Sequence, residues 1–453
     1  MHTLADVRQH QKIWAIAWPM VLANVATTLI GLVDTAILGH LPDSAFIGGA
    51  AIAVSLFNII YLSLAFLRMG TTGLVAQHFG EKNWQGLYTT LILSAGIAFI
   101  LGFALITFST YLFGFAIPVI GGSAAVQEQA AIYAEIRVLG SPAVLFNFVA
   151  IGFLIGIQQS RKALYILLLS QSINIILDFY LAIFLGWEMR GVAWATVISD
   201  LCGSGLALFF VWQFLSPLVS TWKHVQDVSQ KLHRIFGLNR DLFIRTIILL
   251  SIFAFITAQS ARQGDMVLAA NSILIQIFFF FANAIDGFAN AAESRTGELV
   301  GVSKMNNSAE KSDLTKGIKQ TFILSLGQAF VVLSSCLLVL TLHASTVLGW
   351  ISNIPEILAG STDYYFWLII LMFCALVCFV LDGVFIGATK GWEMLLAIVS
   401  AVVFVFFPVW FLSRAWGNHG LWFSLCVFMA LRSLFTFLVY RFLSSNNRWA
   451  SAD

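Results

Sequence analysis

Polar side chains recur at helical spacing inside segments of this chain that are otherwise almost wholly apolar. The stretch TTLIGLVDTAILGHL carries Asp34, and Asn24, Thr27 and Gly31 precede this acid at intervals of three or four residues. Side chains at such intervals lie on one face of an α-helix. A carboxylate flanked by amide and hydroxyl oxygens in an apolar helix can take up and release a proton or a small cation. This stripe is therefore a candidate ion-coupling site.

Two later segments carry the same kind of stripe. Gln171, Asn174 and Asp178 follow at intervals of three and four, and Thr196 and Asp200 are four residues apart. Apolar surroundings disfavour the charged form of a carboxyl group, which makes proton binding the expected chemistry. A structural alternative is that these groups form helix–helix hydrogen bonds that hold a bundle together. The residues predicted to form the coupling site are Asp34, Asp178, Asn174 and Thr196. Secondary candidates in this half of the chain are Asp200, Gln171 and Tyr133.

The composition indicates the medium around these helices. Of the 453 residues, 59% are hydrophobic and only 10% are charged. A soluble domain carries about 25% charged residues, so this chain lacks the charge to cover a surface in water. Apolar runs of about 18 residues or more recur along the chain, which is typical of transmembrane helices. The predicted fold class is an all-α polytopic membrane protein.

Twelve membrane spans are predicted. Their approximate ranges are 13–39, 46–77, 87–113, 125–157, 161–185, 191–215, 239–261, 265–300, 315–341, 355–387, 391–412 and 417–443. An even number of spans places both termini on one side of the membrane. Seventeen of the 24 Lys and Arg, Arg245 among them, fall on that side, three fall opposite and four lie within spans. Because basic residues favour the cytoplasmic side, we expect both termini in the cytoplasm.

This topology brings the candidate residues to similar depths. Asp34 and Asp178 lie about five and seven residues from the outer ends of their spans, and Thr196 and Asp200 lie about five and nine residues into theirs. At a rise of 1.5 Å per residue, all four lie roughly 7–14 Å below the outer edge. We therefore expect the three stripes to meet in the outer half of one helix bundle.

Pro19 precedes Asp34 in the first predicted span. A proline removes a backbone hydrogen bond and can kink a helix. We expect Pro19 to act as a hinge in a helix that carries a titratable acid.

An internal repeat divides the chain. The segment FLIGIQQS at 153–160 aligns with VFIGATKG at 384–391, and GLVAQHFGEKN from Gly73 aligns with SRTGELVGVSK from Ser294. The first alignment sets a pair of glycines at matching places in each half, Gly152 and Gly156 against Gly383 and Gly387. Small pairs at this spacing let helices approach closely in lipid. The predicted domains are a six-helix lobe at 1–217, a cytoplasmic linker at 218–238 and a second six-helix lobe at 239–453, related as a duplicated unit.

The second half has its own acids inside spans. Asp286 and Glu293 lie in the eighth span and Asp382 lies in the tenth, with Arg295 close in sequence. We expect an ion-pair cluster or gate here, with an ion site as the alternative. The positions aligned with Asn174 and Asp178 are occupied by valines, Val405 and Val409. The polar stripe was therefore not duplicated with the fold.

Several other classes of function find no support in the sequence. The five cysteines lie in apolar segments without the accompanying ligands that a metal or redox site needs, so none is assigned to a metal. No HExxH, GxSxG, Walker A or GxGxxG motif is present, so we expect no enzyme activity. We expect no cofactor beyond a coupling ion, no nucleic-acid partner, and a monomer surrounded by membrane lipids.

Five long motifs resemble the DinF-like branch of the bacterial MATE (multidrug and toxic compound extrusion) exporters. They are LVDTAILGHL (32–41), FLRMGTTGLVAQHFGEKN (66–83), AIDGFANAAE (284–293), LDGVFIGAT (381–389) and GNHGLWFSLCVFMALR (417–432). The resemblance implies a V-shaped pair of six-helix lobes in the inner membrane, with a central cavity that opens to one side at a time. It also implies export of organic cations and drugs against an inward flow of protons or sodium. The proton-carrying role of that branch falls on Asp34, with Asn174, Asp178 and Thr196 as its hydrogen-bonding neighbours.

The function expected is a proton-coupled antiporter that exports cationic or amphipathic compounds by alternating access. Sodium coupling stays open, because carboxylate, amide and hydroxyl oxygens suit either ion. A flippase for a lipid precursor is the rival within the superfamily, but its anionic substrate needs a basic cavity. The spans contain eight acids against four arginines, which disfavours that rival. A channel is disfavoured by the repeat and by the absence of a filter motif.

Overall fold

The computed structural model describes residues 7–38, 44–221, 228–305, 311–344, 346 and 355–450. Within these ranges the chain is helical, with a few 3-10 and π turns and no β-strand. Eleven segments of the described chain are long and apolar enough to cross a membrane. The remaining predicted span coincides with α1 (Val7–Leu38), whose side chains are described only as far as Thr27. The prediction of an all-α polytopic membrane protein is confirmed.

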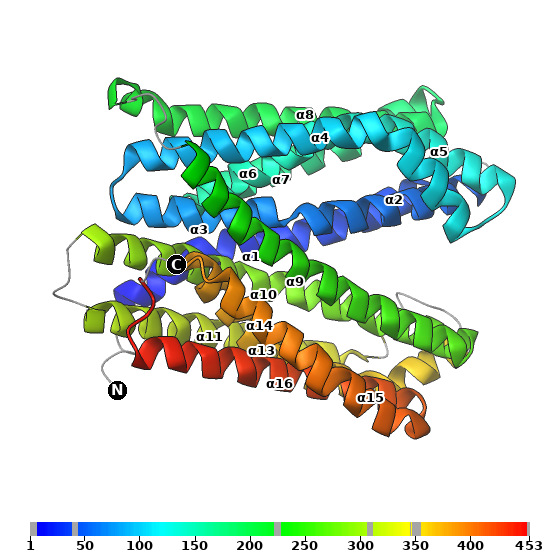
Figure 1. Ribbon diagram of the computed structural model, residues 1–453. Helices are drawn as coiled ribbons and strands as arrows, with labels where there is room; N and C mark the ends of the chain where they lie inside the picture. Colours follow the sequence, from blue (N-terminus) through cyan, green and yellow to red (C-terminus); the bar gives the residue numbers. More distant parts are fainter. Residues whose placement is uncertain are drawn as a thin grey trace. The chain divides into compact units, whose positions relative to one another are not determined.

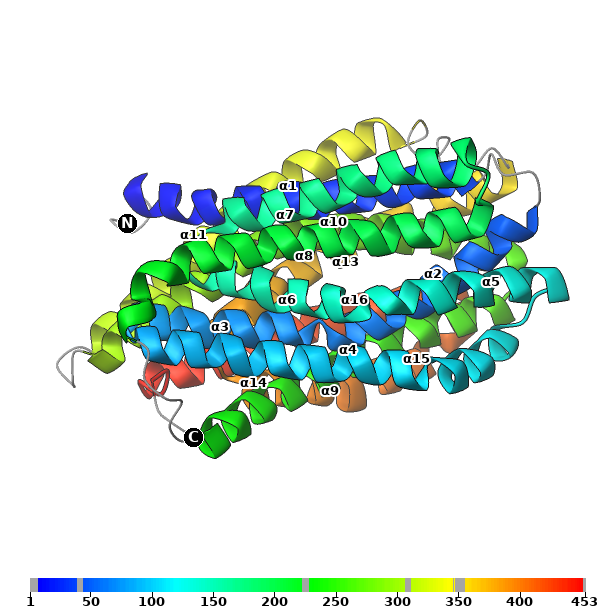
Figure 2. The same ribbon diagram turned by 90° about the horizontal axis from the view of Figure 1, so that it is seen from above.

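The helices follow the predicted spans closely (Figure 1). In the first half they are α2 (Ser44–Leu64), α3 (Phe66–Gly80), α4 (Trp84–Ile120), α5 (Ala124–Arg137), α6 (Ser141–Gly156), α7 (Ser160–Leu177) and α8 (Glu188–Leu215). Two predicted spans are each made of two helices. A single non-helical residue separates α2 from α3. The 3-10 turn η2 (Val138–Gly140) joins α5 to α6, and α6 runs in the same direction as α5 (Figure 2).

The second half repeats this order. Its helices are α9 (Val228–Arg262), α10 (Asp265–Met305), α11 (Lys311–Leu342), α13 (Pro355–Gly387), α14 (Gly391–Ala401), α15 (Phe407–Ser413) and α16 (Asn418–Ser445). A π-helical segment, η5 (Val402–Phe406), connects α14 to α15, and the 3-10 turn η6 (Arg414–Trp416) follows α15. A π-helical segment also ends α7, namely η3 (Asp178–Phe184).

The contacts divide the chain into two compact units. One contains residues 22–239 and the other contains residues 1–21 together with 240–453. We call them the Asp178 unit and the Asp382 unit. The division falls inside α1, two residues beyond Pro19, so the start of α1 belongs with the second half of the sequence. The lobe boundaries predicted from the sequence placed these residues in the first lobe.

The glycine repeat forms the same helix contact in both units. A Cβ on Gly152 would lie 2.5 Å from the carbonyl oxygen of Arg68, and one on Gly383 would collide with the carbonyl oxygen of Ala289. The next glycine in each helix meets the next turn of the same partner: Gly156 meets Thr72, and Gly387 meets Glu293. These four partner residues are paired by the alignment of Gly73 with Ser294. The register predicted from the sequence is therefore confirmed by α6 on α3 and by α13 on α10.

Part of the predicted linker is helical. Residues 228–238 form the first three turns of α9. Ile235 and Leu238 are buried and lie on one face with Leu242, because they are spaced three and four residues apart. Arg234 of this segment donates to the side chain of Gln77 at 3.0 Å. Because the linker is rich in polar residues, the prediction from its sequence missed this amphipathic helix.

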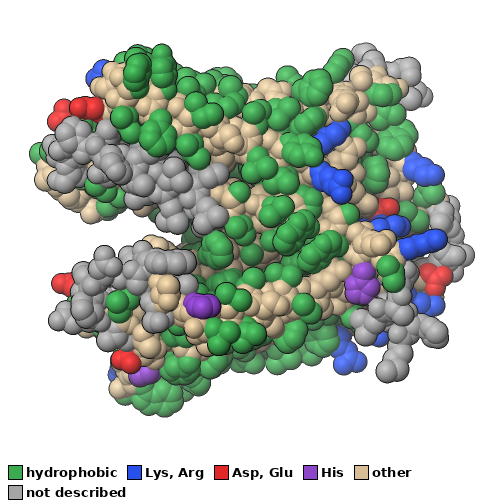
Figure 3. Space-filling view, turned by 180° about the vertical axis from the view of Figure 1, so that it is seen from behind, with side chains coloured by type: hydrophobic (Ala, Val, Ile, Leu, Met, Phe, Trp, Pro, Cys, Tyr) green, Lys and Arg blue, Asp and Glu red, His purple; other side chains and the backbone are tan. Residues whose placement is uncertain are grey.

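The outward surface of the helices is apolar. Large hydrophobic side chains such as Phe103, Tyr111, Phe404 and Leu412 are more than half exposed. In the space-filling view, hydrophobic side chains predominate over the visible face (Figure 3). A surface of this kind is stable against lipid and unstable in water, as expected for a multi-pass membrane protein.

Candidate functional site

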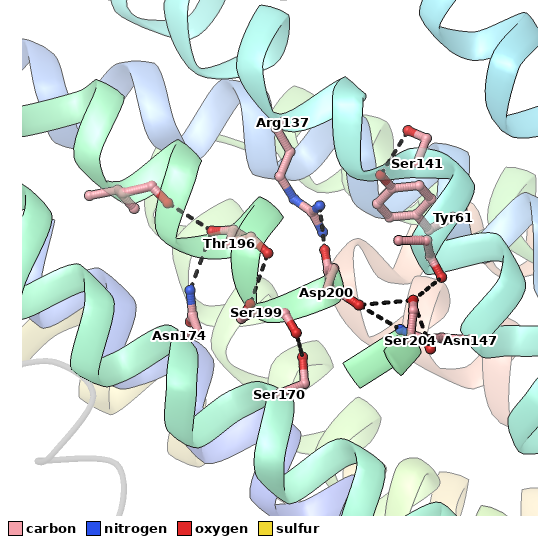
Figure 4. A network of polar contacts seen from close by, with 12 residues as sticks. Tyr61, Arg137, Ser141, Asn147, Ser170, Asn174, Thr196, Ser199, Asp200 and Ser204 are labelled. Carbon is pink, nitrogen blue, oxygen red and sulfur yellow. Dashed lines mark hydrogen bonds and ion pairs between the residues drawn. The ribbon is translucent and has the colours of Figure 1, made fainter. Parts of the chain in front are cut away.

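Two of the predicted site residues meet between α7 and α8. Asn174 is 4% exposed, and its side-chain Nδ2 donates to the hydroxyl of Thr196 at 3.4 Å (Figure 4). The Thr196 hydroxyl donates in turn to the carbonyl oxygen of Val192 at 2.9 Å. The Thr196 hydroxyl proton is used in this bond to the backbone. The lone pairs of the hydroxyl oxygen therefore accept the bond from the Asn174 amide. One residue of each stripe, Asn174 on α7 and Thr196 on α8, thus contacts the other.

Asp178 lies one turn beyond Asn174 and is completely buried. It is the first residue of η3, where the helix changes from α to π geometry. The backbone N–H of Asp178 reaches both the Asn174 and Ile175 carbonyls. Such π turns are rare and frequently occur at functional sites, although η5 in the other unit is a second π segment. A buried carboxyl group at this point fits a site that binds a proton or a cation.

Small residues bring α7 and α8 close enough for these contacts. A Cβ on Gly203 would lie 3.2 Å from Ser170 Cβ, and one on Gly191 would lie 2.7 Å from the backbone of Ala182. The Ser170 hydroxyl donates to the carbonyl oxygen of Ser199 at 3.0 Å, one turn from Asn174. The interface is therefore held by short polar side chains on a closely packed pair of helices.

The acid on the first span is placed only in part. Asp34 lies within helix α1, and its side chain lies outside the described residues. Of its predicted stripe, Thr27 is exposed and its hydroxyl donates to the carbonyl oxygen of Ala23. Asn24 is half-buried. The convergence of Asp34 with Asp178 therefore stays a prediction.

Pro19 is buried inside α1, and α1 is helical on both sides of it. The flanking residues Ala17 and Val21 pack against α10, because a Cβ on Gly287 would lie 3.0 Å from the Ala17 carbonyl and 2.8 Å from the Val21 backbone nitrogen. Pro19 thus lies within the part of α1 that packs closely on α10. Its role as a hinge stays a prediction.

Asp200 has a different environment from the one its spacing suggested. Its carboxylate accepts a hydrogen bond from Arg137 Nη1 at 2.6 Å, in an ion pair that is largely buried. The Asp200 side chain therefore contacts Arg137 on α5. Thr196, which contacts Asn174, lies one turn away on α8. Of the other secondary candidates, Gln171 is half-buried on α7. Tyr133 is buried in an apolar cluster, with its ring edge toward Phe57.

Asp382 is bound by arginines, but not in the predicted pairing. Asp382 Oδ2 contacts both Arg245 Nη2 and Arg432 Nη2, the latter at 2.6 Å, and all three residues are buried. Arg295 forms an ion pair with Glu298, three residues ahead on α10. An ion-pair cluster was expected here, but its basic members are Arg245 and Arg432 rather than Arg295. Glu293 is buried and Asp286 is half-buried on α10.

Sequence reasoning missed several of these partners. Arg245 was assigned to the cytoplasmic side, yet it lies in the fifth turn of α9 and is buried. Asn147 and Ser204 join the Asp200 network at 3.1–3.3 Å and were not singled out. Ser204 follows Asp200 by four residues, so the helical spacing that found Thr196 could also have found it.

Comparison with known proteins was made for the whole chain. The MatE family model matches residues 19–180. The DNA damage-inducible protein F of Escherichia coli (strain K12) is 34% identical over 451 residues, which cover 98% of this chain and 94% of that relative. The multidrug export protein MepA of Staphylococcus aureus (strain bovine RF122 / ET3-1) is 23% identical, and the match covers 93% of this chain and 91% of MepA.

Solved structures share the fold. A crystal structure of MATE in the straight conformation superposes with a TM-score of 0.85 at 18% identity and covers 97% of both chains. The outward-facing conformation of a multidrug resistance MATE family transporter of the MOP superfamily gives the same score and coverage. The family model, the relatives and the shared fold are those of membrane transporters, not of enzymes. The chain belongs to the MATE family, in its DinF-like branch.

Proposed function

We propose that this protein is a proton-coupled antiporter that exports cationic or amphipathic organic compounds by alternating access. The observation that carries the proposal is the contrast between two buried acids. Asp178 is buried at a π turn beside an amide–hydroxyl contact, whereas Asp382 is held by two guanidinium groups. The first environment suits a group that changes its charge during transport, and the second suits a group that keeps it.

The Asp382 unit offers a poor cation site at its span-10 acid. Arg245 and Arg432 supply two positive charges to one carboxylate, so this cluster already carries net positive charge. A sodium ion would have to approach against that charge and displace a guanidinium group. Ion coupling through Asp382 is therefore disfavoured, which supports the Asp178 unit as the place for coupling, with Asp286 and Glu293 as the secondary candidates.

The chemistry at Asp178 fits competition between a proton and a cationic substrate. When Asp34 and Asp178 are deprotonated, their charges favour a cation, and when one is protonated this attraction is weakened. The two states then differ in substrate affinity, as a population shift requires. Bending of α1 near Pro19 would couple the charge change at Asp34 to a change of conformation, because the two units divide just beyond this proline.

Sodium is the alternative coupling ion, because the Asn174, Thr196 and Asp178 side chains all carry oxygen atoms that suit it. A lipid-precursor flippase is less well supported. Four arginines that could attract an anionic headgroup are each paired with a carboxylate: Arg137 with Asp200, Arg295 with Glu298, and Arg245 and Arg432 with Asp382. The Arg137 and Arg295 charges are thus balanced one to one, and the two arginines at Asp382 are both bound to its carboxylate.

The test is transport of a fluorescent lipophilic cation by purified protein in vesicles, with either a pH gradient or a sodium gradient imposed. We expect the pH gradient alone to drive export by the wild type. Asp34→Asn, which mimics the neutral acid, should insert normally and fail to export, while Pro19→Ala should export at a reduced rate. Asp313→Asn is the matched control, because Asp313 is exposed on α11. Export that survives collapse of the pH gradient and requires sodium would assign the coupling to sodium.

We also propose a bacterial inner-membrane location with cytoplasmic termini, which the distribution of Lys and Arg supports. A reporter enzyme that is active only outside the cytoplasm, fused after residue 453, should stay inactive in this topology. An active reporter would reverse the orientation.

A further inference from the structure

A buried polar network lies one turn along α8 from Thr196. Asp200 is its acid and Arg137, the last residue of α5, is its base, with side chains 17% and 11% exposed. The Asp200 backbone carbonyl accepts hydrogen bonds from Asn147 Nδ2 at 3.3 Å and from the Ser204 hydroxyl at 2.9 Å (Figure 4). The network therefore connects α5 and α6 to the same helix that presents Thr196 to Asn174.

The Arg137 guanidinium is held in place by aromatic rings as well as by Asp200. Its central carbon lies 5.7 Å from the Phe57 ring centre and 5.4 Å from that of Tyr61. The Tyr61 hydroxyl is hydrogen-bonded to the Ser141 hydroxyl at 3.1 Å, which fixes the ring. Gly140 leaves room for the pair, because a Cβ there would lie 3.1 Å from Arg137 Nη1. An arginine suits this site better than a lysine, since a planar cation can stack on the rings while it bonds to the carboxylate.

The titratable groups near the Arg137–Asp200 pair come from elements packed on α8. Helix α5 contributes Arg137 and Tyr133, and α2 contributes Tyr61; η3, which also packs on α8, carries Asp178 at its first residue. From α6 and α7 the described contacts involve amide and hydroxyl side chains, namely Asn147 and Ser170. Arg137 is the cation that contacts the Asp200 carboxylate. Its charge thus stabilises the ionised form of an acid that burial would otherwise neutralise.

We propose that Arg137 is a positioning residue that keeps Asp200 ionised and so excludes it from the acids that carry protons in transport. This inference rests on the proposed proton coupling. Two acids on neighbouring helices, Asp178 and Asp200, would otherwise both be available to bind protons within one bundle. With Arg137 present, Asp200 has a constant charge, and proton binding is confined to the acids near the Asn174–Thr196 contact.

The experiment compares Arg137→Gln, Asp200→Asn and the double variant, with Arg137→Lys as the conservative change. Infrared difference spectra report the carbonyl stretch of a protonated carboxyl group, and vesicle assays report the pH profile of export. Arg137→Gln should gain a protonated-carboxyl band near neutral pH, and the number of protons exchanged per substrate should rise by about one. Both changes should disappear in the double variant. Asp200→Asn alone and Arg137→Lys should keep the wild-type pH profile.

The infrared measurement separates this inference from the proposed function, because it does not depend on which gradient drives transport. If the wild type proves to be driven by sodium, the proposed function fails, and the band in Arg137→Gln still decides whether Arg137 keeps Asp200 ionised. A folded Arg137→Gln variant without a new band overturns the inference, as does a band that persists in the double variant. If Arg137→Gln does not fold, the Asp200→Asn variant tests the inference instead. An unchanged pH profile of export in this variant supports the inference, and a shifted profile overturns it.

Discussion

The Asp178 unit and the Asp382 unit share a helix contact but differ in what their equivalent helices carry. In the Asp178 unit, Asn174 of α7 contacts Thr196 of α8 and Asp178 begins η3, whereas the aligned positions in the Asp382 unit are Val405 and Val409. Both units use paired glycines against backbone carbonyls at the same register. Close backbone contacts tolerate few side chains, so they persist in both copies, while the polar positions are free to diverge.

The buried acids of the two units also have different partners. Asp200 has one arginine partner and lies near further polar groups, while Asp382 has two arginine partners, from α9 and α16. Asp382 Oδ1 and Arg245 Nε make no hydrogen bond within the described chain. The arginines of the Asp382 unit therefore tie three helices together through charge, whereas the Asp178 unit keeps an acid at a π turn. The comparison shows that equivalent helices of the two units hold buried acids in different polar surroundings.

The largest expected effect is on transport by the Asp178 unit. Asp178→Asn removes a titratable group but keeps its shape, so the protein should fold with wild-type thermal stability and lose proton-driven export. The measurement is vesicle export together with thermal unfolding in detergent. Wild-type export by a folded Asp178→Asn variant would show that Asp178 is not part of the coupling site. The proposed functional difference between the Asp178 unit and the Asp382 unit would then be wrong.

The converse effect is expected at Asp382. Asp382→Ala leaves two buried arginines without their carboxylate, and breaking a buried ion pair in this way costs about 3–5 kcal/mol. We expect a large loss of folded protein and a lower unfolding temperature in fluorescence-detected gel filtration. Asp313→Ala on the exposed start of α11 is the control and should unfold like the wild type. An Asp382→Ala protein that is fully stable but inactive would assign a transport role to this acid.

The shared glycine contacts should give equal effects in both units. Gly156→Ala and Gly387→Ala place a methyl group against a backbone carbonyl, and such overpacking costs about 1–3 kcal/mol. Gly96 and Gly327 have open space around the Cβ position, so their alanine variants should be stabilised by about 0.5–1 kcal/mol. The four unfolding temperatures, measured side by side, test this pattern. Destabilisation in one unit alone would show that the repeat is not matched in packing.

The smallest effect is expected at the Asn174–Thr196 contact. Asn174→Ala removes one long hydrogen bond, which is worth about 0.5–1.5 kcal/mol. Export should fall but remain proton-driven, and the unfolding temperature should change little. Val405→Ala at the aligned position is the matched control and should leave export unchanged. A complete loss of export in Asn174→Ala would show that this amide is essential for transport, as a ligand of the coupling ion would be.

The sequence by itself determined the fold class, the spans and the polar stripes of this protein. Hydrophobic content and run length depend on local sequence, because a lipid-embedded helix must be apolar along its own length. The stripes of Asn174 and Asp178 and of Thr196 follow from helical spacing alone. The repeat register was also visible in the sequence, because glycines at close helix contacts cannot drift without a steric cost.

The tertiary structure decided the ion pairs, the π turn and the unit boundaries. Arg137 and Asp200 are 63 residues apart in sequence, and Arg245 and Asp382 are 137 apart, so no local pattern could pair them. Charge attraction acts through space, and the helix that supplies the partner is set by packing. The π turn at Asp178 and the helical start of α9 also depend on neighbouring helices. Spacing could therefore identify which residues are polar, and only the packing of helices decided which acids stand near a base.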